Sequence, residues 1–257
     1  MENVILYSVL RSLRAKNDAG PKAKTDINEF LTEEGFKVMD LDLPEKRLEK
    51  FLFVHLKLKR LFKGRQFDNV ILQYPFYSVF LTKKIIENAK KVTHGKFLIM
   101  VHDVETLRVY DGNKQFEKDE MEIFNSADGL IVHNSKMAEW LKQHGVTVPI
   151  TILGIFDYRN DCQKNERFEY QKSICFAGNL EKSTFLKKVK LNDAKLDVYG
   201  PSPAQKYQKG VTYCGVYTPD DLPNHLNENF GLIWDGDELS ACTGVFGNYM
   251  RYNAPHK

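Results

Sequence analysis

Residues 69–103 have the sequence NVILQYPFYSVFLTKKIIENAKKVTHGKFLIMVHD, and this stretch decides the fold. Two short apolar runs, Asn69–Tyr74 and Lys96–His102, flank the segment Val79–Lys91, in which apolar residues recur with the period of a helix. Uninterrupted apolar runs such as VILQY and FLIMV are typical of strands buried on both faces. The order strand, helix, strand therefore predicts two parallel strands joined by a right-handed crossover.

The same alternation extends in both directions from this unit. The other strands predicted in this half are Val4–Leu10, Lys37–Leu41, Gly129–His133 and Ile150–Ile155. The other predicted helices are Thr25–Glu34, Glu45–Lys63, Phe116–Asn125 and Ser135–His144. We expect a doubly wound α/β domain of about 155 residues, with a parallel sheet covered by helices on both faces.

A polar stretch without apolar period, Tyr158–Gln171, interrupts the alternation and predicts a linker. The strand and helix pattern then resumes in a second α/β block. Its predicted strands are Ser173–Ala177, Leu196–Tyr199, Val211–Gly215 and Gly231–Trp234, and its predicted helices are Ser183–Val189 and Asp220–Glu228. We therefore expect one domain at residues 1–158 and a second at residues 172–257.

Composition excludes several classes of protein. The 257 residues carry 37 Lys and Arg against 34 Asp and Glu, a formal charge of +3, which is too balanced for a nucleic-acid-binding domain. The four cysteines lie far apart without a C-x-x-C motif, so neither a zinc site nor a disulfide framework is expected. No apolar run is long enough to span a membrane, and the N-terminus lacks the pattern of a secretory leader. We expect a cytoplasmic protein without a bound metal.

Residues 45–63 have the pattern of a basic amphipathic helix, which either packs on a sheet or meets an anionic lipid surface. A helix that flanks a sheet is typically turned toward the core, with its lysines solvated. We favour packing on the sheet, and so at most peripheral contact with a membrane.

Ligands of parallel α/β domains bind at the carboxyl ends of the strands. The first such loop, Arg11–Lys24, has no glycine-rich dinucleotide or P-loop motif, so it is either a basic substrate-binding loop or a plain surface loop. His102 and Asp103 follow the fourth strand, where they can act as a base or orient a substrate hydroxyl. Alternatively, Asp103 caps the next helix.

Three stretches of the second half also follow predicted strands. In FAGNLEKS, residues 176–183, Gly178 permits close approach of the backbone and Lys182 lies where a helix N-terminus attracts phosphate. Tyr217 either stacks on a nucleotide base or packs against its own domain. The final stretch, YMRYNAPHK at residues 249–257, brings Arg251 and other polar residues to a place where a diphosphate would find its counter-charges.

Five motifs in order along the chain resemble the GT-B glycosyltransferases. They are HDVETLR (102–108), FAGNLEKS (176–183), GVYTPDDLP (215–223), FGLIWDG (230–236) and YMRYNAPHK (249–257). More narrowly, the chain is similar to the bacterial glucosyltransferases that extend N-acetylglucosamine on serine-rich-repeat adhesins, and to related galactofuranosyltransferases. The resemblance implies a GT-B-like fold of two Rossmann-like parallel-sheet domains facing a cleft. It also implies transfer of a hexosyl group, glucosyl first, from a UDP-sugar to a sugar hydroxyl on a glycoprotein or glycan, without a bound cofactor.

The resemblance also implies roles for individual residues. On the donor side, Asn179 and Lys182 would belong to the donor loop, and Tyr217 would lie against the nucleotide. Asn253 and Lys257 would neutralise the diphosphate. On the acceptor side, His102 and Asp103 would face the sugars, and Arg11 and Lys16 of the first loop would help to hold the acceptor.

The sequence departs from the family at its end. In the family the N-x-P-H-K run leads into further helices, whereas here it ends at Lys257, so we expect the second domain to be incomplete. A non-catalytic GT-B-like partner, which binds acceptor and stabilises a true transferase, is therefore the alternative. An epimerase or phosphorylase on the same fold is less favoured. The donor sugar, the acceptor, the anomeric outcome and the oligomeric state, including a homo-oligomer, stay open.

Overall fold

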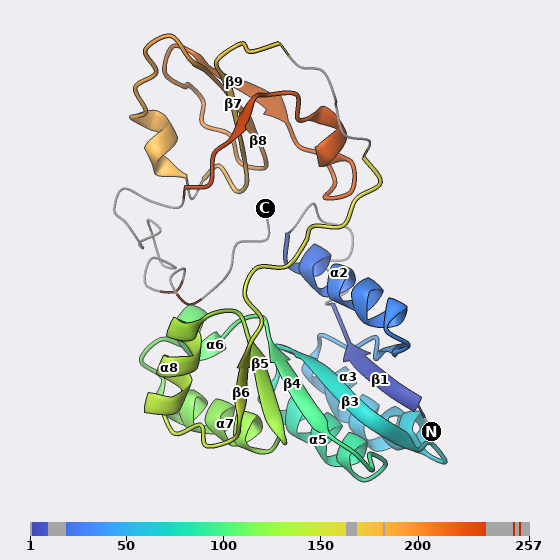
Figure 1. Ribbon diagram of the computed structural model, residues 1–257. Helices are drawn as coiled ribbons and strands as arrows, with labels where there is room; N and C mark the ends of the chain where they lie inside the picture. The colour runs from blue at the N-terminus through green and yellow to red at the C-terminus, as the bar shows by residue number, and fades with distance from the viewer. Residues whose placement is uncertain are drawn as a thin grey trace. The chain divides into compact units, whose positions relative to one another are not determined.

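Figure 1 shows the computed structural model of the chain, which describes residues 2–9, 19–162, 169–181, 183–234, 249 and 252. The chain divides into two compact units. The first contains strand β1 and the stretch Gly20–Phe156, and Tyr252 also belongs to it. The second begins at Asp157. The described parts of the predicted linker, residues 158–162 and 169–171, are neither helix nor strand.

The first unit is built on one parallel sheet of six strands. They are β1 (Glu2–Tyr7), β2 (Lys37–Asp40), β3 (Phe67–Tyr74), β4 (Phe97–Val101), β5 (Gly129–Val132) and β6 (Ile150–Ile152). Their order across the sheet is β2-β1-β3-β4-β5-β6, and every pair is parallel. The continuous apolar runs thus became strands as predicted, and β3 and β4 pair with Leu72 opposite Ile99.

Helices cover both faces of this sheet, as expected. They are α2 (Ala19–Glu33), α3 (Arg47–Leu52), the π-helix η1 (Phe53–Leu58), α4 (Lys59–Phe62), α5 (Val79–Lys90), α6 (Glu105–Arg108), α7 (Lys114–Asn125) and α8 (Ser135–Gln143). Leu72 faces the core formed with α5, α7 and α8, whereas its neighbour Ile71 faces the smaller core with Ile27 of α2. Within the described residues, no helix is both long and apolar enough to cross a membrane.

Side-chain caps explain where several of these helices begin. Ser78, Asn113 and Asn134 each accept a hydrogen bond from the backbone N–H three residues further on, at the starts of α5, α7 and α8. The cap at Asn113 starts α7 two residues earlier than the apolar pattern indicated.

The capping role considered for Asp103 is wrong, because the carboxylate of Glu120 takes it. Glu120 reaches across from α7 and accepts hydrogen bonds from the N–H groups of Glu105 and Thr106, at 2.8 and 3.0 Å. The N-cap position of α6 is Val104, which has no capping side chain. Glu120 also accepts the hydroxyl of Tyr74 at 2.7 Å, so one fully buried carboxylate joins α6, α7 and the end of β3.

The second unit contains a second parallel sheet. Its strands are β7 (Ser173–Ala177), β8 (Lys195–Tyr199), β9 (Val211–Gly215) and β10 (Phe230–Gly231), in the order β10-β7-β8-β9. Phe176, Leu196 and Val198 form the centre of its core. β10 starts one residue earlier than predicted and ends three residues earlier. The two parallel sheets confirm the predicted α/β fold class with its pair of Rossmann-like domains.

The two α-helices predicted in this unit are instead short 3₁₀ turns, η2 (Thr184–Lys187) and η3 (Leu222–His225). Pro223 stands in the first turn of η3, a position that a helix tolerates, and the N-cap residue Asp221 forms no side-chain cap. At η2 the hydroxyl of Ser183 donates to the carbonyl of Asn179, so it does not cap the turn as an acceptor.

Gly200 is required where the ends of β7 and β8 meet. Its φ is +143°, and a Cβ atom there would lie 1.7 Å from the carbonyl oxygen of Gly178. Hydrogen bonds from Gly178 to Tyr199 and from Gly200 to Gly215, both 2.9 Å, hold the same edge together. Only a residue without a side chain permits this approach.

We predict that Gly200→Ala destabilises the second unit by about 2–4 kcal/mol, because the methyl group must displace backbone atoms. Gly231→Ala is the matched control, since its Cβ would meet nothing closer than the Cys175 sulfur at 4.0 Å. Urea unfolding followed by circular dichroism measures both. Equal midpoints for the two variants would contradict the close approach.

Candidate functional site

The order of the first sheet identifies the edge where a ligand is expected. Strands β1 and β3 are neighbours, and the connections from them leave toward opposite sides of the sheet. Ligands of open α/β sheets bind outside the carboxyl ends of the strands at such a point. The predicted acceptor residues Arg11 and Lys16 follow β1, and both lie outside the described residues.

A buried lysine joins the carboxyl ends of β1 and β3. The ammonium group of Lys24, on α2, donates to the carbonyl oxygens of Pro75 at 2.8 Å, Ser8 at 3.3 Å and Gln73 at 3.5 Å. Lys24 is 3% exposed, and burial lowers its pKa to about 8, although the charges of Asp103 and Glu105 act in the opposite direction. Lys24 therefore organises this edge from inside the fold.

Hydrogen bonds of Gln73 connect Lys24 to His102. The amide nitrogen of Gln73 donates to the carbonyl of Lys24 at 3.1 Å and to Asn28 Oδ1 at 2.7 Å. Its oxygen therefore faces His102 and accepts from Nε2 at 2.6 Å. Because the amide oxygen only accepts, Nε2 of His102 carries the proton. His102 is 7% exposed and lies directly after β4, as predicted.

Asp103 lies beside His102 in a chain of charged groups. Its Oδ2 is 3.5 Å from Arg108, and Arg108 in turn binds Glu105 Oε1 through Nε at 2.9 Å and through its terminal nitrogen at 2.8 Å. Asp103 is partly exposed, whereas Glu105 is buried. Burial raises the pKa of Glu105 to about 7, despite the opposing charge of Arg108. A carboxyl group that titrates near neutral pH is typical of functional sites.

A small hollow of about 180 Å³ opens beside Glu105. Its walls come from the end of β3, the start of α5, α6 and the start of α7. They are formed by Tyr74, Tyr77, Ser78, Val79, Thr82, Glu105, Tyr110 and Phe116. Tyr110 stacks on Phe116 with ring centroids 3.8 Å apart and planes 13° from parallel. Stacked aromatic rings beside a carboxylate offer an apolar surface and a hydrogen-bond acceptor to one small polar ligand.

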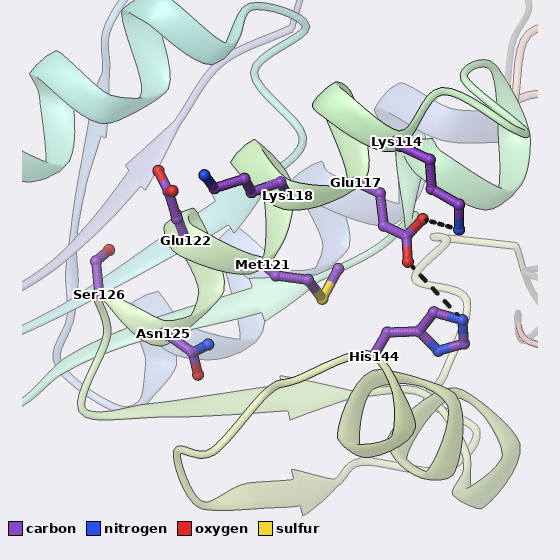
Figure 2. A pocket seen from close by; sticks show the side chains of 8 residues that line it. All are labelled: Lys114, Glu117, Lys118, Met121, Glu122, Asn125, Ser126 and His144. Carbon is purple, nitrogen blue, oxygen red and sulfur yellow. Dashed lines mark hydrogen bonds and ion pairs between the residues drawn. The ribbon is translucent and has the colours of Figure 1, made fainter.

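A larger, more open hollow of about 590 Å³ lies elsewhere in the first unit, between α7 and the end of α8 (Figure 2). Glu117 is central to it, with Lys114 at 2.9 Å and the ring of His144 at 4.0 Å. His144 also stacks on Trp140. None of the described residues that the sequence predicted for the site lines this hollow, and its two carboxylates are already paired, Glu117 with Lys114 and Glu122 with Lys83. We therefore place the candidate site at the strand ends.

The order of the second sheet places its switch point between β7 and β10. Gly178 and Asn179 directly follow β7, so they lie at the predicted place. Asn179 turns the chain there: its Oδ1 accepts from the N–H of Glu181 at 3.0 Å and its carbonyl accepts from Ser183. The sequence prediction for the backbone loop thus coincides with the edge that the topology selects.

Tyr217 follows β9, two strands away from this switch point. Its ring stacks on His225 with centroids 3.6 Å apart, and its hydroxyl donates to the carbonyl of Cys214 at 3.1 Å. One face of the ring is therefore covered by its own domain, as the packing interpretation required.

Four predicted donor-side residues lie outside the described residues, namely Lys182, Arg251, Asn253 and Lys257. In the part of the chain that is described, no group of three His, Cys, Asp or Glu side chains is arranged to hold a metal ion.

Sequence reasoning missed Lys24, Gln73 and Glu105. Gln73 is the single polar residue in the apolar run VILQY, which is a signal that a buried hydrogen-bonding partner is needed. Lys24 and Asn28 stand four residues apart, so both lie on the same face of α2. These two patterns together point to the Lys24–Gln73–Asn28 contact.

Two curated proteins are similar to this chain. It is 25% identical over 252 residues to the beta-1,6-galactofuranosyltransferase WbbI of Escherichia coli K12, covering 95% of this chain and 72% of the relative. It is 26% identical over 188 residues to glucosyltransferase 3 of Streptococcus parasanguinis, covering 72% of this chain. The chain spans about half the length of that second protein, 56%.

Among solved structures, a TarM variant from S. aureus, crystallised with fondaparinux, alpha-GlcNAc-glycerol and UDP, is 16% identical. It aligns with 70% of this chain and 39% of its own, at a TM-score of 0.46.

Family models match both halves of the chain. The model of the glucosyltransferase 3-like N-terminal domain matches residues 7–155, and that of the glucosyltransferase 3-like C-terminal domain matches residues 174–257. The two matches follow in order and together cover most of the sequence. The chain belongs to the glucosyltransferase 3-like family of glycosyltransferases.

Proposed function

We propose that this chain transfers a hexosyl group, glucosyl first, from a UDP-sugar to a sugar hydroxyl of a glycan or glycoprotein. The observation that carries the proposal is the match of both family domains, in order, to the two parallel sheets. Both named relatives are hexosyltransferases, one for galactofuranose and one for glucose. The choice of UDP follows from the resemblance to GT-B enzymes.

In the proposed reaction, the oxygen of an acceptor hydroxyl attacks the anomeric carbon of the donor. The bond from that carbon to the phosphate oxygen breaks, and UDP leaves with the electron pair. Lys182, Arg251, Asn253 and Lys257 would offset the charge that develops on the diphosphate. Asn179 and Gly178 would bring backbone groups close to the donor, and Tyr217 would lie along the nucleotide.

Asp103 is our candidate for the base that accepts the acceptor's proton in an inverting transfer. It is partly exposed at the carboxyl end of β4, next to Arg108, so it is within reach of a ligand there. His102 is held by Gln73 through Nε2 and would orient the sugar beside it. In a retaining transfer no protein base is needed, and both residues would position the substrate.

The hollow beside Glu105 is the proposed subsite for one sugar ring of the acceptor. A volume of about 180 Å³ is well below the roughly 300–1,000 Å³ of pockets for drug-sized ligands, so a single ring is the matching size. The stacked pair Tyr110 and Phe116 would contact the apolar face of the ring, and Glu105 would accept from its hydroxyl groups. Arg11 and Lys16 would contribute from the loop after β1.

A turnover assay tests the function. With UDP-glucose and an acceptor bearing N-acetylglucosamine, the chain should release UDP and extend the acceptor. Asp103→Asn should lower kcat about 100-fold or more while UDP affinity stays unchanged. Lys257→Ala should instead abolish UDP binding in calorimetry. Acceptor binding without UDP release from any nucleotide sugar would favour the non-catalytic partner and overturn the proposal.

Tyr110→Ala tests the acceptor subsite. Loss of one aromatic contact of about 1 kcal/mol should lower kcat/KM for the acceptor about fivefold, with UDP affinity unchanged. Val109→Ala is the control, because Val109 is 57% exposed and does not line the hollow. If both variants keep wild-type values for the acceptor, the sugar ring binds elsewhere.

Glu105 should also give the protein a pH signature that needs no substrate. Its pKa is raised from 4.5 to about 7 in the fold, so its stabilising contribution is complete below pH 4.5 and is lost as the pH rises through 7. Between pH 4.5 and 7 the unfolding free energy of the wild type should fall relative to Glu105→Gln, by about 2–3 kcal/mol. Urea unfolding across this range measures the difference, and parallel curves would contradict it.

A further inference from the structure

The continuous helical segment formed by α3, η1 and α4, Arg47 to Phe62, carries apolar residues on two sides. One set is buried against the sheet: Phe53 at 6% exposure, Val54 at 7%, Leu58 at 0% and Phe62 at 3%. The other set faces solvent: Leu48 at 70%, Phe51 at 54%, Leu52 at 45% and Leu56 at 58%. The expectation that this segment packs on the sheet is thus confirmed, and it leaves a second apolar stripe exposed.

The π-helical turn keeps the two sets apart. In an α-helix Phe53 and Leu58, five residues apart, would point about 140° from each other. In the π-helix the i and i+5 residues are hydrogen-bonded neighbours, so both reach the core, and Phe62 follows four residues later. The exposed Leu48, Leu52 and Leu56 repeat every four residues and stay together on the other side.

The exposed stripe lies in the most basic part of the chain. Residues 45–63 contain seven Lys and Arg against two Glu, a formal charge of +5, whereas the whole chain carries +3. Arg47, Lys57, Lys59 and Arg60 are all exposed. No ion pair is recorded for these four side chains among the described residues.

We propose that this stripe, Leu48, Phe51, Leu52 and Leu56 with its flanking basic residues, binds an anionic lipid surface. A helix with Phe and Leu on one side and Lys and Arg beside them lies in the plane of a bilayer interface, its apolar residues inserted among the headgroups. The long basic side chains reach from the apolar stripe to the phosphates. A second copy of the chain is a less suitable partner for the stripe, because it would bring together two segments that each carry a formal charge of +5.

This surface is independent of the proposed transfer reaction. None of the four stripe residues lines either hollow or contacts the groups at the strand ends. Because all four are exposed, their substitution should leave the fold unchanged, so binding is tested without loss of structure.

The test is co-sedimentation of the full chain with vesicles of phosphatidylcholine alone or mixed with phosphatidylglycerol. The wild type should bind the anionic vesicles at least tenfold more tightly than the neutral ones, and salt should weaken the binding. The double variant Phe51→Ser, Leu56→Ser should bind at least tenfold more weakly, as should Lys57→Gln, Arg60→Gln. Ile155→Ser, at a position 88% exposed, is the control and should bind as the wild type does.

Two results would overturn the proposal. One is equal binding of the wild type to neutral and anionic vesicles, or equal binding of the wild type and the Phe51→Ser, Leu56→Ser variant. The other is a wild type that binds no vesicles and is dimeric by light scattering while the same variant is monomeric, which would assign the stripe to a second copy. Circular dichroism verifies that every variant is folded.

Discussion

The ammonium group of Lys24 is the contact on which the candidate site of the first unit depends. It lies where β1 and β3 end: of its three carbonyl partners, Gln73 belongs to β3, and Ser8 and Pro75 directly follow β1 and β3. The backbone of the same residue orients Gln73, and Gln73 sets the proton position on His102. A buried cation is costly unless its surroundings offset the loss of water. The cradle of carbonyl oxygens does so, and thereby fixes the strand ends relative to the histidine.

In the second unit, backbone groups rather than a buried side chain hold the strand ends together. Gly178 and Gly200 directly follow β7 and β8, and Gly215 is the last residue of β9. Their backbone groups bond to one another or to neighbouring backbone, so the chain turns away from the sheet without side chains in between. The donor-side prediction began from Gly178. The closest approach, however, is made by Gly200, whose Cα faces the carbonyl group of Gly178. The loop that we propose for the donor is thus shaped by a glycine that does not belong to it.

The strands were predictable because runs such as VILQY and FLIMV are buried on both faces and are therefore almost entirely apolar. A polar residue in such a run, as Gln73 is, needs a buried hydrogen-bonding partner. The same reasoning placed His102, Asp103, Gly178 and Asn179 at strand ends. It failed for the two helices predicted in the second unit, which are 3₁₀ turns without side-chain caps. It also missed Glu105 and Glu120, because a buried carboxylate depends on partners that are distant in sequence.

The π-helical turn at Phe53–Leu58 has a consequence for how this segment tolerates insertion and deletion. A π-helical turn holds one residue more than an α-helical turn. Removing a single residue there would restore a regular α-helix in which Phe53 and Leu58 stand four residues apart, and at about 100° per residue both side chains then lie on the same face. Leu58 and Phe62 would then still face the core, as they do in the π-helical form. Sequences that share this fold can therefore lose one residue from this turn and keep the same side chains in the core.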